Sequence, residues 1–181
     1  MASGTTRRAA DGAPVEWHDA IAQWASAGRP VLEHVARTYG AHVTYQEMSE
    51  LVQEATGITT GVPFRHWIGS VLGELARRER PGEPLLTSLV VRANGTIGDG
   101  YIVPIRERGE PDPADLELHA ATERLRCYRH FGADMPSDGG RPAFTKSVAA
   151  KRAYARPTRP RLVCPTCNLQ LPVSGHCDNW D

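Results

Sequence analysis

The residues best suited to hold a metal ion lie at the C-terminal end of the chain. Cys164 and Cys167 form a Cys-x-x-Cys pair, a spacing that lets one tight turn direct two thiolates at the same cation. Cys177 follows, and a regular second pair would place its last ligand at the position occupied by Trp180. A closed structural zinc site needs four ligands, and the neutral imidazole of His176 is the best substitute near pH 7. The sequence therefore predicts a zinc-ribbon-like knuckle with a structural Zn²⁺ held by Cys164, Cys167, His176 and Cys177. The alternative is a knuckle that no longer binds metal.

A second candidate site is the run of positive charge between residues 141 and 163. This segment contains seven Lys or Arg residues and no Asp or Glu, and Phe144 and Tyr154 interrupt it. Such a segment can neutralise phosphates and become ordered on binding nucleic acid. Of its cations, we expect Lys151 and Arg152 to contact DNA. The alternative is a solvated linker whose charge only keeps it soluble.

Composition narrows the class of protein. The chain has 181 residues, of which 40% are hydrophobic and 23% charged, as expected for one folded domain with a small appendage. Because 21 Lys and Arg balance 21 Asp and Glu, a uniformly basic nucleic-acid-binding surface is disfavoured, although local patches are not. There is no run of about 18 apolar residues and no apolar secretory signal. We expect a cytoplasmic protein with no membrane partner, associated with the nucleoid if it is bacterial.

Motifs of several enzyme classes are absent from the sequence. It has no Walker loop and no Gly-x-Ser-x-Gly elbow. The glycines at Gly98 and Gly100 lack the strand-to-helix context of a dinucleotide site. A metal-dependent nuclease would need a cluster of His, Asp and Glu that the sequence does not suggest. We therefore expect no enzymatic activity.

The apolar pattern predicts helices in the first half of the chain. Helical spacing indicates two helices before residue 40, with Gly28 ending the first and Pro30 in the first turn of the second. Thr44 and Glu47 form a capping box at the start of the next helix. Residues 1–13 are small and polar, and we expect them to form a disordered arm.

A β-hairpin is predicted in the middle of the chain. Residues 85–91 are rich in β-formers, residues 96–105 are the expected return strand, and Asn94-Gly95 between them is a strong hairpin signal. The helices on either side are expected from near Pro63 and from Asp112 to about Gly132.

Three features between residues 42 and 101 occur together. They are a capped helix after Val-Thr-Tyr, a helix containing Ile-Gly-Ser-Val-Leu, and a strand–turn–strand from Val90 to Tyr101. This order resembles the winged-helix DNA-binding domain of the O6-alkylguanine-DNA alkyltransferases and their alkyltransferase-like relatives. The resemblance places the family's base-flipping tyrosine at Tyr45 and a glycine of its recognition helix at Gly69. It implies a partner, double-stranded DNA.

The sequence departs from this family at the reactive site. The family's reactive cysteine falls on Thr87 and its activating histidine on Ser88, whereas alkyl transfer needs a thiolate beside a base. The resemblance therefore implies a protein like the alkyltransferase-like relatives, which lack the cysteine and bind damaged DNA without repairing it. The arginine that replaces the flipped nucleotide falls on His66, with Arg65 before it, and this departure puts base flipping in question.

The fold class expected is α+β and mainly helical, a winged helix-turn-helix with flanking helices. In chain order the expected parts are a disordered arm (1–13), a helical domain with the winged helix (14–133), a basic Pro/Gly-rich linker (134–161) and the zinc-ribbon-like knuckle (162–181).

We expect a non-enzymatic DNA-binding protein that recognises modified or distorted bases. The alternative is a protein-interaction adaptor that uses the winged helix and the knuckle. On the DNA-binding reading, base edges are read from the recognition helix and phosphates are contacted by the hairpin. The alternatives are that Tyr45 is only a core residue and that the cations are ordinary solvated side chains. The expected DNA contacts are Tyr45, Arg65, His66, Ser70, Arg92, Lys151 and Arg152.

Overall fold

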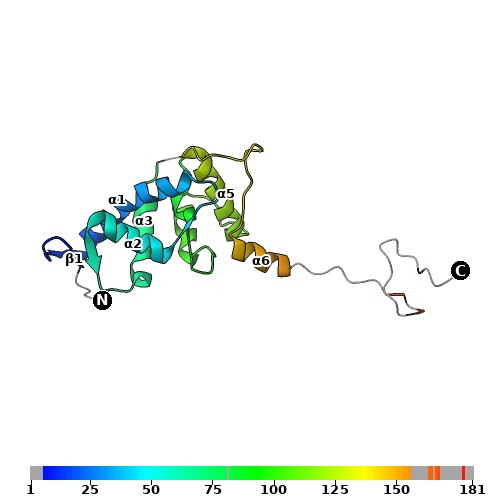
Figure 1. Ribbon diagram of the computed structural model, residues 1–181, viewed down its shortest axis with the longest axis horizontal. Coiled ribbons are helices and arrows are strands. Elements are labelled where there is room, and N and C mark those ends of the chain that lie inside the picture. Colours follow the sequence, from blue (N-terminus) through cyan, green and yellow to red (C-terminus); the bar gives the residue numbers. More distant parts are fainter. Residues whose placement is uncertain (1–5, 81, 156–162, 165, 168–176, 178–181) are drawn as a thin grey trace. The chain divides into compact units, whose positions relative to one another are not determined.

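The computed structural model divides into two compact units, residues 1–148 and residues 149–181, and each is described by itself. The first unit contains almost all of the secondary structure, and its fold is α+β and mainly helical, as predicted (Figure 1). The structure describes residues 6–80, 82–155, 163–164, 166–167 and 177.

Short strands lie between the helices in the first half of the described chain, and the second half is mainly helical. In order, they are β1 (Thr6–Arg8), β2 (Pro14–Val15), α1 (Trp17–Ala36), β3 (Val43–Thr44), α2 (Tyr45–Thr56), β4 (Ile58–Thr60), the 3-10 helix η1 (Phe64–His66), α3 (Ile68–Arg77), the 3-10 helix η2 (Leu86–Leu89), β5 (Val90–Val91), the 3-10 helix η3 (Asp99–Tyr101), α4 (Ile102–Glu107), α5 (Leu116–His130) and α6 (Lys146–Ala155).

Part of the expected N-terminal arm belongs to the fold. Strand β1 is the middle strand of a three-stranded antiparallel sheet, in the order β2-β1-β4. Thr6 lies opposite Val15 on one side and Thr60 on the other, and its hydroxyl donates to the Val15 carbonyl oxygen. The prediction of disorder over residues 1–13 is therefore wrong for β1. Backbone hydrogen bonds to the strands on both sides stabilise this polar strand, and such pairing cannot be inferred from amino-acid composition.

Helix α1 is continuous where two helices were predicted. Gly28 and Pro30 both lie inside it, although each costs helical stability. Gly28 serves close packing, because a Cβ on it would lie 2.7 Å from Met48 Cε and 3.3 Å from Leu75 Cδ1. The approach of α2 and α3 to this face therefore outweighs the local preference for a helix end.

The predicted capping box of α2 is confirmed. The Glu47 carboxylate accepts from the Thr44 backbone N–H at 2.7 Å, and the Thr44 hydroxyl accepts from the Glu47 N–H at 3.2 Å. Gly57 ends the helix in the left-handed conformation, with φ +63°. Both ends of α2 are thus set by local chemistry.

The predicted hairpin is wrong except for its turn. The Arg92 N–H donates to the Thr96 carbonyl oxygen at 2.8 Å, and Gly95 adopts the positive φ that the turn requires. The return strand is reduced to one bridge between Val91 and Ile97, and residues 99–107 are helical instead. Strand β5 pairs in parallel with β3.

A helical repeat explains why the return strand does not form. Tyr101 and Ile105 lie four residues apart and are both buried in a second core cluster with Leu85 and Ile97. Tyr101 and Ile105 therefore share one face of the helical segment formed by η3 and α4, and Ile97 packs against the same cluster from the turn before it. The β-forming composition of the segment conceals this spacing.

The C-terminal boundaries also differ from the prediction. Helix α5 is capped by Asp115, whose side chain accepts from the Leu118 N–H at 3.1 Å, and Asp112 binds Arg106 instead. Helix α6 lies inside the expected linker, 134–161. Proline and glycine mark the loop before α6, but the segment Lys146–Ala155 contains neither residue and is helical.

A pair of stacked tryptophans occupies the main core. Trp24 of α1 is fully buried and Trp67, just before α3, is 1% exposed. Their ring centroids lie 4.4 Å apart with an interplanar angle of 27°. Each indole N–H donates to a backbone carbonyl, Trp24 to Ile58 at 3.1 Å and Trp67 to Val62 at 3.0 Å. The pair therefore joins α1, β4 and the start of α3.

Replacing Trp67 tests this arrangement. We expect Trp67→Ala to lower the free energy of unfolding by about 3–5 kcal/mol, because it removes a stacked, hydrogen-bonded core ring. Chemical denaturation measures the change. The control Tyr154→Ala removes a ring that is 94% exposed and should change stability by less than about 0.5 kcal/mol. Equal effects of the two substitutions would contradict the assignment of Trp67 to the core.

Candidate functional site

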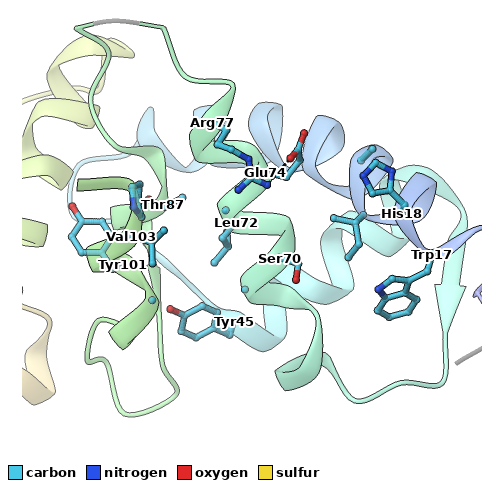
Figure 2. A pocket seen from close by; sticks show the side chains of 16 residues that line it. Trp17, His18, Tyr45, Ser70, Leu72, Glu74, Arg77, Thr87, Tyr101 and Val103 are labelled. Carbon is cyan, nitrogen blue, oxygen red and sulfur yellow. Dashed lines mark hydrogen bonds and ion pairs between the residues drawn. The ribbon is translucent and has the colours of Figure 1, made fainter. Parts of the chain in front are cut away.

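A cavity of about 650 Å³ lies beside helix α3. Figure 2 shows Trp17 and His18 at one end of it, Thr87, Tyr101 and Val103 at the other, and Ser70 and Leu72 of α3 between them. The side chains come from α1, α2, α3 and the segment from η2 to α4. The lining residues are Trp17, His18, Ile21, Ala22, Tyr45, Gly69, Ser70, Leu72, Gly73, Glu74, Arg77, Thr87, Gly100, Tyr101, Val103 and Pro104.

Helix α3 lines this cavity with small residues at Gly69, Ser70 and Gly73 and with the larger side chains of Leu72, Glu74 and Arg77. Its apolar face is buried, whereas Gly69 and Ser70 are exposed and Gly73 is half-buried. A Cβ on Gly69 would meet no atom within 4 Å, so this glycine is not required for packing inside the protein. The surface therefore allows a ligand to approach the α3 backbone closely.

Tyr45 belongs both to the core and to the cavity wall. It is the first residue of α2, packs against the main core, and lines the cavity. Its hydroxyl contacts Gly98 so closely that no side chain would fit there. Burial raises the pKa of Tyr45, and the nearby Arg92 lowers it in part. The phenol is therefore neutral and held in place near neutral pH.

The wall opposite α1 contains Thr87, at the position where the resemblance places the reactive cysteine. Thr87 is 6% exposed, and its hydroxyl has no hydrogen-bond partner among the described residues. The segment around it is held by α5. The Glu123 carboxylate accepts from the Leu85 N–H at 2.8 Å, and the Arg124 guanidinium donates to the Ser88 carbonyl oxygen at 3.1 Å. Side chains thus satisfy the backbone of this wall.

The nearby thiol is not a nucleophile. Cys127 is fully buried, does not line the cavity, and lies 3.9 Å from the Ser88 hydroxyl. Burial raises its pKa to about 12, so the thiolate is negligible at neutral pH. The residues lining the cavity include no cysteine. The arrangement can bind a ligand, but it offers no thiolate for alkyl transfer.

The predicted DNA contacts are only partly brought together. Tyr45 and Ser70 both line the cavity. Arg65 and His66 are exposed in η1, just before α3, but are not among the lining residues. Arg92 donates to Asp99 at 2.6 Å, which offsets its charge. The remaining two expected contacts lie in the part of α6 that belongs to the second unit, where Lys151 is exposed and Arg152 is half-buried.

Three of the four predicted zinc ligands lie together. The sulfurs of Cys164, Cys167 and Cys177 are all within 4.8 Å of one another, and those of Cys167 and Cys177 are 3.5 Å apart. Thiolates around a tetrahedral zinc are about 3.8 Å apart, given Zn–S bonds of about 2.3 Å. Backbone N–H groups of Cys167 and Thr166 lower the pKa of Cys164 to about 7. The cluster can hold a metal, while His176 lies outside the described residues.

Comparisons with known proteins returned no relative. No protein-family model matches the chain, and no curated protein or solved structure is significantly similar to it. Within the part of the chain that the structure describes, no helix is both long enough and apolar enough to span a membrane.

Sequence reasoning missed most of the cavity wall. Trp17 and His18 of α1 were not among the expected site residues, and residues 101–104 were expected in a strand that does not form. The signal for the second group was the spacing of Tyr101 and Ile105. No sequence pattern indicated that α1 and α4 would face the same side of α3.

The buried Glu79 predicts a pH effect on the stability of the cavity wall. Its carboxylate accepts from the Leu86 N–H at 2.9 Å and from Arg108 at 2.6 Å. Burial raises its pKa from 4.5 to about 7, although Arg108 and the Leu86 N–H lower it in part. The folded state therefore holds this proton more tightly than the unfolded state does.

Because of this difference, ionisation of Glu79 lowers the free energy of unfolding as the pH rises from about 4.5 to about 7. We expect the unfolding free energy of the wild type, minus that of Glu79→Gln, to decrease across this window and then to level off. Denaturation at a series of pH values measures the difference. A difference that increases with pH would show that the ion pair with Arg108 dominates instead.

Proposed function

We propose that the protein binds double-stranded DNA and receives a modified or distorted base in the cavity beside α3, without reacting with it. The single observation that carries this proposal is that the exposed small residues Gly69 and Ser70 of α3 open onto a cavity of about 650 Å³. The resemblance to a winged helix implies that the DNA-reading helix is the same α3, and this part of the resemblance does not depend on the return strand of the hairpin, which does not form.

The chemistry of the cavity suits a nucleobase. Leu72 and Val103 provide apolar surface, and the rings of Tyr45 and Tyr101 provide aromatic surface. Bases removed from the stack are held by apolar or aromatic contacts on their faces and by hydrogen bonds at their edges. The hydroxyl of Ser70 supplies a polar group for such an edge.

Positive charge beside α3 supports contact with the DNA backbone. Arg65 and His66 are exposed in η1, and among the described residues neither forms an ion pair with a carboxylate within 4.0 Å. The exposed guanidinium of Arg65, next to a reading helix, is suited to bind a phosphate and to position the helix. Arg65 thus offers a local phosphate contact on a chain whose total charge is neutral.

Binding without repair follows from the cavity wall. Thr87 occupies the position of the family's reactive cysteine, and Cys127 is buried with a raised pKa. A threonine hydroxyl without an adjacent base does not transfer alkyl groups. The proposed protein therefore recognises a base and leaves its chemistry to other proteins.

A negative charge introduced at Gly69 of α3 tests the DNA proposal. We expect Gly69→Glu to weaken duplex binding by about tenfold or more, because a carboxylate there repels phosphates and fills the approach to the cavity. The fold should tolerate the change, since Gly69 has open space around it and glutamate favours a helix. Fluorescence anisotropy with plain duplex and with duplex containing O6-methylguanine measures the affinities.

The control Ala10→Glu adds the same charge at an exposed turn residue and should leave affinity nearly unchanged. Arg65→Gln should also reduce the slope of log affinity against log salt by about 1, the value for one phosphate contact. If the wild type binds neither duplex at low salt, the DNA proposal is wrong and the adaptor alternative is favoured.

We further propose that Cys164, Cys167 and Cys177 hold a structural Zn²⁺, with His176 as the fourth ligand. The closeness of the three sulfurs supports it. Zinc would supply the ordering energy that so short a segment cannot obtain from a core of its own.

Metal analysis of the purified chain tests the zinc proposal. We expect about one zinc per chain in the wild type, and loss of most of it in Cys167→Ser, because three ligands bind zinc more weakly than four. Cys127→Ala is the matched control, since Cys127 is buried in the first unit, and it should keep its zinc. A metal-free wild type that takes up no zinc from a competing chelator would contradict the proposal.

A further inference from the structure

A second cavity, of about 500 Å³, lies in the first unit, away from helix α3. Helix α5, the turn after β5, the loop after α1 and the segment before α6 form its walls. Its lining residues are Tyr39, Gly40, His42, Ala93, Gly95, Ala121, Arg124, Leu125, Tyr128, Arg141, Ala143, Phe144, Thr145, Lys146 and Ser147.

The charged side chains that line this cavity are all basic. Arg124, Arg141 and Lys146 contribute cations and His42 contributes an imidazole, while no Asp or Glu is among the lining residues. Arg141 is 86% exposed and lies 3.6 Å from Asp138, so its charge is offset in part. Walls that carry one sign of charge concentrate counter-ions of the opposite sign. The lining therefore favours an anion.

Arg124 forms the buried part of this positive wall. It is 3% exposed, and among the described residues no carboxylate lies within 4.0 Å of its guanidinium. Its hydrogen bonds go to the carbonyl oxygens of Ser88 at 3.1 Å and Ala143 at 3.5 Å. These carbonyl dipoles and the electrostatic attraction of Glu117 compensate the buried charge only in part, because burial still lowers the pKa of Arg124. A bound anion would complete the compensation.

The cavity is built by contacts far apart in sequence. The Thr145 hydroxyl donates to the Gly95 carbonyl oxygen at 2.8 Å, and the Ser147 hydroxyl donates to the Asn94 carbonyl oxygen at 2.5 Å. A Cβ on Gly95 would lie 2.7 Å from Thr145 Oγ1. These contacts hold the segment with Arg141 and Lys146 against the turn, so the basic groups are positioned by the fold.

We propose that this second cavity is a phosphate-binding site in which Arg124, Arg141 and Lys146 hold the anion. A guanidinium offers several N–H donors in one plane and suits the oxygens of phosphate, and an ammonium adds a compact charge. Two sources carry this chemistry, a free phosphate and a phosphodiester of bound DNA. Binding of a DNA phosphodiester rests on the proposed function, whereas binding of free phosphate does not.

The substitution Ala93→Glu tests the site without removing Arg124, which also holds the backbone of η2. Ala93 is exposed and lines the cavity, so a glutamate there would add the missing carboxylate at the cavity wall. Ala93→Gln is the matched control, since it adds nearly the same volume without charge. Isothermal titration with inorganic phosphate, at constant ionic strength kept with chloride, measures binding in the wild type and in both variants.

We expect saturable phosphate binding by the wild type, retention in Ala93→Gln, and weakening of about tenfold or more in Ala93→Glu. Thermal unfolding should give the same order, with phosphate raising the transition temperature of the wild type and of Ala93→Gln more than that of Ala93→Glu. A parallel titration with plain duplex DNA separates the sources. If Ala93→Glu loses duplex affinity and Ala93→Gln does not, the site binds the DNA backbone. If duplex affinity is the same in all three proteins and phosphate binding is saturable, the site binds free phosphate.

The proposal is overturned if the wild type shows no saturable phosphate binding and Ala93→Glu binds duplex as well as Ala93→Gln does. Equal weakening in both variants would also overturn it, because the effect would then come from volume and not from charge. The base-receiving proposal is tested separately, because it fails if Gly69→Glu leaves duplex affinity unchanged, whatever the variants of Ala93 show.

Discussion

The stacking of Trp24 on Trp67 sets the position of helix α3, and the candidate site depends on that position. The stack and the two indole hydrogen bonds join α1 to the start of α3, so the apolar face of α3 is committed to the core. The opposite face, with Gly69 and Ser70, must then face outward. The same packing places Trp17 and His18 of α1 at one end of the cavity (Figure 2). A core interaction thus creates a surface suited to recognition.

The opposite wall of the cavity is held in a fixed shape by buried side chains. Helix α5 holds the backbone around Thr87 through Glu123 and Arg124, and Glu79 adds a third contact from the end of α3. These groups are buried, so the hydrogen bonds form in a region of low dielectric and restrict the segment strongly. With a threonine at its centre, the wall can bound a binding cavity and bring no nucleophile to it. This is the part of the structure on which the proposal of recognition without reaction rests.

Local signals predicted the local structure well, and long-range packing accounts for the errors. The Thr44–Glu47 capping box and the Asn94-Gly95 turn formed as expected, because a few neighbouring residues determine each of them. Gly28 was interpreted as a helix end, although it is a site of close contact with Met48. The cysteine cluster was predicted from spacing alone, and three of its members do lie together. The two cavities were not predictable, because their walls come from segments up to about a hundred residues apart.

The proposed function requires above all that α3 is the part of the chain that contacts DNA. Hydrogen–deuterium exchange of the full chain, with and without a duplex containing O6-methylguanine, examines this directly. The account predicts slower exchange of backbone amides in η1 and α3, residues 64–77, and in residues 99–104 across the cavity, when the duplex is bound. Protection confined to other segments, with unchanged exchange in α3, would contradict it.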